Sequence, residues 1–439
     1  MNRETFGYSP EELNLFRRHA WRYLILFSLL YAAHYCSRLN LQNAGAVMLS
    51  QLNWEASDIG ILTGTLFCTY AMGHLVNGRL GEIIGPMHMV SLSIFLSVLC
   101  NLLMGFQRSI PVMALIWGLN GYVQSMAWGP GVAALTAWWP GNTRGFAVGF
   151  ANGFSGFGQV AATAMVALSF ALFPDLGWRA AFFIPPLLPL ILLVIYRIFA
   201  KPSPRDIGLR EYVEPDEDKA RAEEEMQALV ESKGHLYPYK YLLSNPRFLI
   251  WMVVIFACGL ARYGLVTWIP LYFIERFQID ITEGLLQSMA LPVGMGVGTL
   301  IVPWLTDRYC PNNRMAAAAV SALVGSLSIA VFYLLRPDSL TQFVLIELML
   351  FVAGFCIYAI NGIVWAYATD VGGRVFSGTA SGVLDFSAYL GAAIQSVVYG
   401  FLLNSGSWGT VFLSIAGFCL LIFLLGLYTL WQDHRKINA

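Results

Sequence analysis

Twelve long apolar runs dominate this chain of 439 residues. A helix needs about 20 apolar residues to cross about 30 Å of hydrocarbon. Each run reaches that length: residues 21–45, 58–80, 87–106, 110–138, 145–172, 180–199, 247–274, 284–306, 314–335, 340–366, 376–403 and 408–432. Within a bilayer, backbone polar groups must be hydrogen-bonded inside the protein, so such runs fold as packed helices. We therefore predict an all-α membrane protein with twelve transmembrane helices.

The composition excludes the main soluble classes. Hydrophobic residues make up 57% of the chain and charged residues only 12%, against about 25% charged in a soluble domain. The 26 Lys and Arg residues equal the 26 Asp and Glu residues, so the chain has no basic excess for binding nucleic acid. The seven cysteines lack the paired spacing of a disulfide framework or a zinc site. We expect no metal and no cofactor.

Enzymatic and ATP-driven activities also lack support. The sequence contains no metal-ligand cluster and no nucleophile with a base at a recognisable spacing. The phosphate-binding loop G-x-x-x-x-G-K-[ST] is absent as well. We therefore expect a membrane protein that is not an enzyme, whose activity is driven by ion or solute gradients.

One polar segment divides the chain. Residues 200–246 include the acidic run 214–218 and separate two groups of six apolar runs. This predicts an N-terminal half at 1–199, a linker at 200–246 and a C-terminal half at 247–439.

Lys and Arg residues in the short loops predict the orientation. One side carries most of them: Arg17, Arg18, Arg22, Arg79, Arg144, Lys201, Arg205, Arg210, Arg308, Arg314, Arg374, Arg435 and Lys436. The opposite side carries only Arg108, Arg179, Arg276 and Arg336. Both termini and the linker are therefore predicted to be cytoplasmic, in a plasma membrane or bacterial inner membrane. We expect the protein to act as a monomer.

The two groups of six runs carry matching residues at a nearly constant separation. Arg38 and Arg262 lie 224 residues apart, three more pairs lie 225 apart, and two later pairs lie 230 apart. These further pairs are Asp58 with Glu283, Gly73 with Gly298, Glu82 with Asp307, Arg144 with Arg374 and Trp178 with Trp408. Duplicated halves of this kind are typical of the major-facilitator architecture.

Equivalent cytoplasmic turns of the two halves are charged. They contain Arg79 with Glu82, and Asp307 with Arg308. A carboxylate at a helix end can pair with a nearby arginine or cap a helix N-terminus, and either contact breaks when the halves rock. We predict a conformational latch at these four residues.

Two arginines lie deep within equivalent apolar runs. Arg38 follows Arg22 by about 24 Å of helix, and Arg262 follows Arg247 by about 22 Å. An ionised group at the bilayer centre costs at least about 2.5–3.5 kcal/mol, so such a group usually faces a cavity and functions there. Their matched depth, with no carboxylate at a comparable place in either run, predicts a site for an anion. A guanidinium grips phosphate or carboxylate through two parallel hydrogen bonds.

Asp385 is the other deeply placed charge, about 16 Å beyond Arg374. Two roles remain open for it: it partners an arginine in the empty cavity, or it accepts a proton and couples transport to the proton gradient. Polar and aromatic residues near these charges are candidates to complete substrate recognition: Tyr35, His34, Tyr70, His74, Trp128, Asn152, Ser155, Tyr263, Trp268 and Asn361.

Several segments together resemble a known family. The run 260–272, Leu-Ala-Arg-Tyr-Gly-Leu-Val-Thr-Trp-Ile-Pro-Leu-Tyr, is similar to the seventh-helix signature of the organophosphate:phosphate antiporters. This is the major-facilitator family of the bacterial glycerol-3-phosphate and hexose-phosphate transporters. Agreement extends over essentially the whole chain, at residues 35–38, 126–130, 137–139, 144–145, 202–203, 208–209, 378–382 and 389–391. The resemblance implies that Arg38 and Arg262 grip a phosphate group and that an organophosphate exchanges for inorganic phosphate.

Three positions depart from that family. Ser155 stands where its glycerol-phosphate and hexose-phosphate members have a histidine, His74 replaces a lysine, and Asp385 replaces a small residue. These changes remove positive charge from the cavity and add a carboxylate. Proton-coupled symport of a non-phosphorylated organic or sugar acid is therefore an alternative function. A second alternative, from another class, is a transporter-like sensor of an external sugar phosphate.

Overall fold

The structure is a computed structural model that describes residues 8–139, 144–210, 228–229, 232–234, 236–309, 313–336 and 339–437. This part of the chain is helical and contains no β-strand. The N-terminal helices are α1 (Pro10–His34), η2 (Tyr35–Ser37), α2 (Asn40–Leu52), α3 (Ala56–Ile84), α4 (Pro86–Gly105), α5 (Ile110–Gln124), α6 (Trp128–Trp138), α7 (Arg144–Leu172), η4 (Pro174–Arg179), α8 (Ala180–Phe183) and α9 (Leu187–Phe199).

Two short helices follow, and then the C-terminal helices. The short helices are η5 (Pro204–Ile207) and α11 (Tyr237–Leu243). The remaining ones are α12 (Pro246–Phe277), α13 (Ile281–Ser288), α14 (Ala290–Tyr309), α15 (Arg314–Leu334), α16 (Leu340–Asn404) and α17 (Trp408–Ile437). Two candidate spans, Leu340–Ala368 and Thr379–Asn404, lie within α16. We call them the first and second spans of α16.

Ten helical segments of the described chain are long and apolar enough to cross a membrane. The two other expected spans, 21–45 and 110–138, coincide with interrupted helices. The first breaks at Tyr35–Ser37, between α1 and α2, and the second breaks at 125–127, between α5 and α6. Pro130 explains the second break, because in a continuous helix its ring would clash with the carbonyl of residue 126. The expected spans 180–199 and 284–306 are also divided, between α8 and α9 and between α13 and α14. The predicted all-α fold is confirmed, with several of its helices discontinuous.

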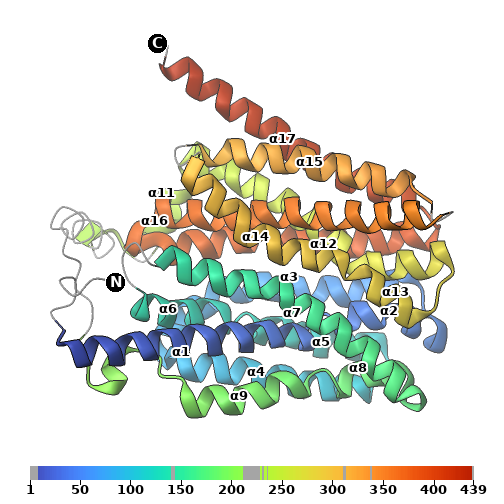
Figure 1. The fold of residues 1–439 in the computed structure, drawn as a ribbon, viewed down its shortest axis with the longest axis horizontal. Helices are drawn as coiled ribbons and strands as arrows, with labels where there is room; N and C mark the ends of the chain where they lie inside the picture. Colours follow the sequence, from blue (N-terminus) through green and yellow to red (C-terminus); the bar gives the residue numbers. More distant parts are fainter. Residues whose placement is uncertain are drawn as a thin grey trace.

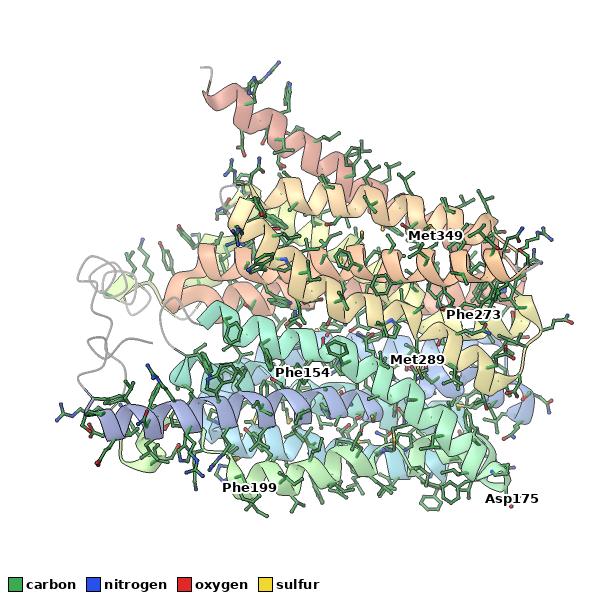
Figure 2. The ribbon with its side chains drawn as sticks, viewed as in Figure 1. Phe154, Asp175, Phe199, Phe273, Met289 and Met349 are labelled. Atoms are coloured by element: carbon green, nitrogen blue, oxygen red, sulfur yellow. The ribbon has the colours of Figure 1, made fainter. Side chains whose placement is uncertain are left out.

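The helices run alongside one another in two adjacent groups (Figure 1). The N-terminal end of α1 lies at one end of the bundle, and the turns after α2 and α16 lie at the opposite end, which we call the distal end. Large apolar side chains project from the outer faces, such as Phe199 on α9, which is 51% exposed (Figure 2). Facing lipid, these side chains would stay out of water.

Glycines bring the two halves close together at the distal end. A Cβ added at Gly60 of α3 would lie 2.4 Å from the Ser396 carbonyl oxygen on the second span of α16. One at Gly400 would lie 3.0 Å from the Ala56 carbonyl oxygen. Beyond this contact, the Asn404 amide donates to Glu55 Oε2 (2.6 Å) and accepts from the Ser57 backbone N–H (3.0 Å). We call this contact between Gly60 and Gly400 the glycine seam.

The structure describes the side chain of only one of the four residues of the predicted latch. The side chains of Arg79, Glu82 and Asp307 lie outside the described part of the structure. The exposed Arg308 guanidinium lies over the rings of Trp304 (5.7 Å) and Tyr309 (5.8 Å).

Candidate functional site

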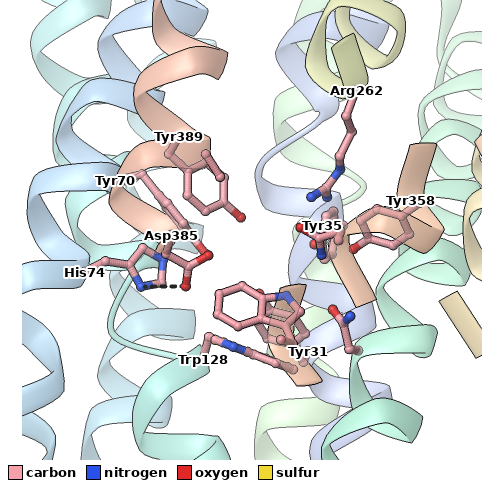
Figure 3. Close-up of a pocket in the computed structure, with 13 residues that line it drawn as sticks. Tyr31, Tyr35, Tyr70, His74, Trp128, Arg262, Tyr358, Asp385 and Tyr389 are labelled. Carbon is pink, nitrogen blue, oxygen red and sulfur yellow. Dashed lines mark ion pairs between the residues drawn. The ribbon is translucent and has the colours of Figure 1, made fainter. Parts of the chain in front are cut away.

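About 360 Å³ of empty space, part of it open to solvent, forms a cavity between the two halves. Four of its walls come from N-terminal helices (α1 with η2, α3, α6 and α7) and two from α12 and α16. Its lining residues are Tyr31, Tyr35, Tyr70, His74, Trp128, Asn152, Arg262, Tyr358, Asn361, Trp365, Asp385, Ala388 and Tyr389 (Figure 3).

Arg262 enters this cavity from α12 with its charge uncompensated. The guanidinium carbon lies 4.5 Å from the centre of the Tyr263 ring and 4.1 Å from that of Tyr358. Nε and Nη2 are buried and have no hydrogen-bond partner among the described residues. No described carboxylate forms an ion pair with this side chain. The rings orient the guanidinium by cation–π attraction and leave its N–H groups free for an anion.

Arg38 repeats this arrangement in the N-terminal half. Its guanidinium carbon lies 4.7 Å from the Tyr35 ring centre and 4.6 Å from that of Tyr70. Nη2 donates to the Tyr70 hydroxyl (3.2 Å), whereas Nη1 has no partner in the part of the chain that is described. The side chain is fully buried and stands behind Tyr35 and Tyr70, which line the cavity. Both arginines are therefore held by pairs of tyrosine rings rather than by carboxylates.

The break between α1 and α2 positions Arg38. The helix interruption exposes the Ser37 carbonyl, which accepts hydrogen bonds from the amides of Asn101 (2.9 Å), Asn120 (2.9 Å) and Gln124 (3.0 Å). These donors replace the helix bonds that the break removes. The Gln124 side-chain oxygen also accepts from Arg38 Nε at 2.7 Å. One glutamine thus fixes both the broken backbone and the arginine.

Replacing Gln124 by leucine is expected to weaken anion binding about tenfold and to lower the free energy of unfolding by about 1–3 kcal/mol. The change leaves Arg38 Nε buried without an acceptor, which carries a penalty of that size. Phosphate-ester titration and thermal unfolding of the purified protein measure both effects. Gln287→Leu serves as the control, because that side chain is on α13 and, among the described residues, bonds only Glu283. Unchanged binding in Gln124→Leu would remove its positioning role.

Asp385 occupies the wall of the cavity opposite Arg262 (Figure 3). Its nearest titratable partner is His74, with 3.5 Å between Asp385 Oδ2 and His74 Nδ1. His74 stacks on the Tyr389 ring, 5.6 Å between centres, and contacts the Tyr70 ring edge-on at 4.5 Å. Of the two roles left open for Asp385, a direct ion pair with an arginine is absent from the described residues.

The structure gathers eight of the predicted binding residues around the cavity: Tyr35, Tyr70, His74, Trp128, Asn152, Arg262, Asn361 and Asp385. Arg38, Ser155 and Tyr263 contact members of this set from behind. Ser155 hydrogen-bonds the Tyr358 hydroxyl across the two halves, and Tyr263 lies beneath Arg262.

Two predicted residues lie elsewhere. His34 is buried within the N-terminal half, 3.3 Å from the Ser93 hydroxyl. Trp268 is buried two turns beyond Arg262 on α12 and does not line the cavity.

Sequence reasoning missed several residues of the site. Tyr31, Tyr358, Trp365, Ala388 and Tyr389 line the cavity, and Gln124 holds Arg38. Two of them could have been found from their spacing in the sequence. Tyr31 lies four residues before Tyr35, and Tyr389 lies four residues after Asp385, and residues so spaced share one helix face.

Comparison with known proteins identifies the family. Residues 27–396 match the family model described as Major Facilitator Superfamily. This chain belongs to the major facilitator superfamily. Two curated relatives of this major facilitator are "Probable hexose phosphate transport protein" of Chlamydia trachomatis and "Glycerol-3-phosphate transporter" of Bacillus subtilis. The first is 25% identical over 95% of this chain and 92% of the relative, and the second 24% identical over 92% and 91%.

A solved structure has the same fold. It is a bacterial homologue of the human lysosomal transporter Spinster, in an inward-facing, unoccupied conformation. The TM-score is 0.68 at 15% identity, and the match covers 93% of this major facilitator and 95% of that chain. The fold predicted from the duplicated halves is therefore confirmed.

Proposed function

We propose that this protein is a secondary transporter of a small organic anion, with an organophosphate as its substrate. The observation that carries the proposal is the pair of buried arginines, one from each half, whose free N–H groups have no carboxylate partner among the described residues. Guanidinium groups suit the planar, bidentate recognition of phosphate. The relatives named for hexose phosphate and glycerol 3-phosphate transport support a phosphate group as the anion.

The mechanism follows from the position of the cavity between the halves. A bound anion attracts Arg38 and Arg262 from opposite sides and so favours the arrangement in which the halves are close. Binding shifts the population only through such differential contacts. Rocking of the halves around the occupied site then exposes it to the other side of the membrane. The substrate exchanges for inorganic phosphate in a monomer of the bacterial inner membrane, with both termini cytoplasmic.

Reconstituted uptake tests this function. Liposomes containing the protein and loaded with inorganic phosphate are expected to accumulate labelled glycerol 3-phosphate or glucose 6-phosphate, while protein-free liposomes do not. Ligand-dependent thermal stabilisation without uptake would favour the sensor alternative. Stabilisation by non-phosphorylated sugar acids alone would contradict the organophosphate as substrate.

The contact between Asp385 and His74 favours a second candidate, proton-coupled symport of an organic acid. The groups facing this carboxylate are His74 and Tyr70 on α3, Tyr389 on α16 and Arg262 on α12. If protonation of Asp385 drives symport, Asp385→Asn retains exchange of internal for external substrate but loses accumulation driven by a pH gradient. Counterflow and gradient-driven uptake in the same liposomes separate the two activities, and unchanged accumulation excludes the proton role.

A further inference from the structure

The cavity has a second charged end that the anion site does not use. Asp385 is 94% buried, since only 6% of its surface is exposed, and it lines the cavity. No described residue donates a hydrogen bond to it, and its 3.5 Å contact with His74 is longer than the 2.7–2.9 Å of a charge-assisted hydrogen bond. A buried carboxylate without a close donor is costly unless a cation joins it.

The surroundings of Asp385 suit an organic cation. Tyr70, His74 and Tyr389 form a cluster of rings in mutual contact, with 4.3 Å between the centres of the two tyrosines. Trp128 and Tyr31, whose ring centres are 4.8 Å apart, form the adjacent wall (Figure 3). A carboxylate bordered by electron-rich ring faces is a usual environment for an ammonium group.

The charges of the site also favour a substrate that carries its own cation. Two guanidiniums and one carboxylate give a net charge of +1 when His74 is counted as neutral. A phosphate monoester is close to a dianion at pH 7. When it is bound, the net charge of the cavity and ligand together is therefore −1. The same monoester with an ammonium group has a net charge of −1 and leaves the cavity neutral.

On this basis, and resting on the proposed function, we propose that the substrate is a zwitterion. Its phosphate binds Arg262, with Arg38 adding positive charge from behind Tyr35 and Tyr70, and its ammonium group binds Asp385 among the rings of Tyr70 and Tyr389. The two ends of the cavity then hold the two charges of one small molecule. Asp385 acts as a specificity-determining residue that selects amine-bearing phosphates over neutral ones.

A matched ligand pair tests this proposal. Phosphoethanolamine and ethylene glycol monophosphate differ by an ammonium group in place of a hydroxyl. Calorimetric titration of the purified full-length protein at pH 7.5 is expected to show at least tenfold tighter binding of phosphoethanolamine. In Asp385→Asn this preference disappears, because phosphoethanolamine loses affinity while the hydroxyl ligand binds at least as well. Glu347→Gln is the matched control, since it makes the same chemical change on α16 outside the cavity lining.

The outcomes separate the zwitterion from the proposed function. Equal affinity of the wild-type protein for the two ligands overturns the amine site and leaves the organophosphate site intact. A preference that survives in Asp385→Asn also overturns it. If neither ligand nor inorganic phosphate binds, the proposed function itself fails. If Asp385→Asn does not fold, the affinities of the wild-type protein for the two ligands still test whether the site prefers an ammonium group.

Discussion

Replacing Arg262 by lysine is expected to reduce organophosphate uptake at least about 100-fold while leaving the protein folded. Lysine keeps the positive charge but lacks the planar fork that forms two parallel hydrogen bonds. Its ammonium group also cannot stack between the rings of Tyr263 and Tyr358, which lie 4.5 and 4.1 Å from the guanidinium carbon. Losing one hydrogen bond to a charged group costs about 1.5–3 kcal/mol, a range that includes the approximately 2.7 kcal/mol of a 100-fold change.

The measurement is initial uptake of labelled glycerol 3-phosphate in reconstituted liposomes, normalised to the amount of inserted protein. Arg38→Lys is expected to behave in the same way, because Arg38 is held by the same kind of ring pair. Arg247→Lys is the control on α12, since this exposed arginine pairs with Asp433 outside the cavity. Normal uptake in either cavity variant would contradict the arginine site.

Replacing Gly60 by valine is expected to reduce transport at least about tenfold without preventing substrate binding. The valine Cβ would lie 2.4 Å from the Ser396 carbonyl oxygen and 3.2 Å from Gly400 Cα, so α3 and the second span of α16 must separate. The clash lies between the halves, and the packing within each half is retained. The variant therefore disfavours the arrangement in which the distal end is closed.

Spin labels on the distal ends of α3 and α16 measure this opening as an increased distance. Gly417→Val is the matched control, because a Cβ at Gly417 meets nothing within 4 Å. A wild-type distance distribution together with wild-type uptake in Gly60→Val would show that the glycine seam does not control transport.

The twelve apolar runs and the spacing between halves predicted the fold, because hydrocarbon thickness leaves few alternatives to long helices. The charge argument also selected Arg38, Arg262 and Asp385, since a charge in a membrane span is rare enough to be informative. Aromatic residues carry no comparable signal, because most of them lie in the core or at the membrane interface. Tyr358 and Tyr389 were therefore missed, and Trp268 was given a place in the cavity that it does not occupy.

The break between α1 and α2 was beyond prediction for a different reason. Tyr35–Ser37 contains neither proline nor glycine, so nothing local marks the break. The break depends on amides from Asn101, Asn120 and Gln124 meeting at one carbonyl. Such a convergence brings donors from two helices, α4 and α5, to a carbonyl on a third segment, and it becomes visible only after the chain has folded.

The ring-held arginines carry a consequence for the kinetics of the unloaded protein. Because tyrosine faces orient the two guanidiniums without cancelling their charge, the empty cavity keeps both of them buried with only one carboxylate nearby. The barrier to reorienting without cargo is correspondingly high, since desolvating uncompensated charge is expensive. We therefore expect each return stroke to require another bound anion, which would make the proposed transport a one-for-one exchange of solutes.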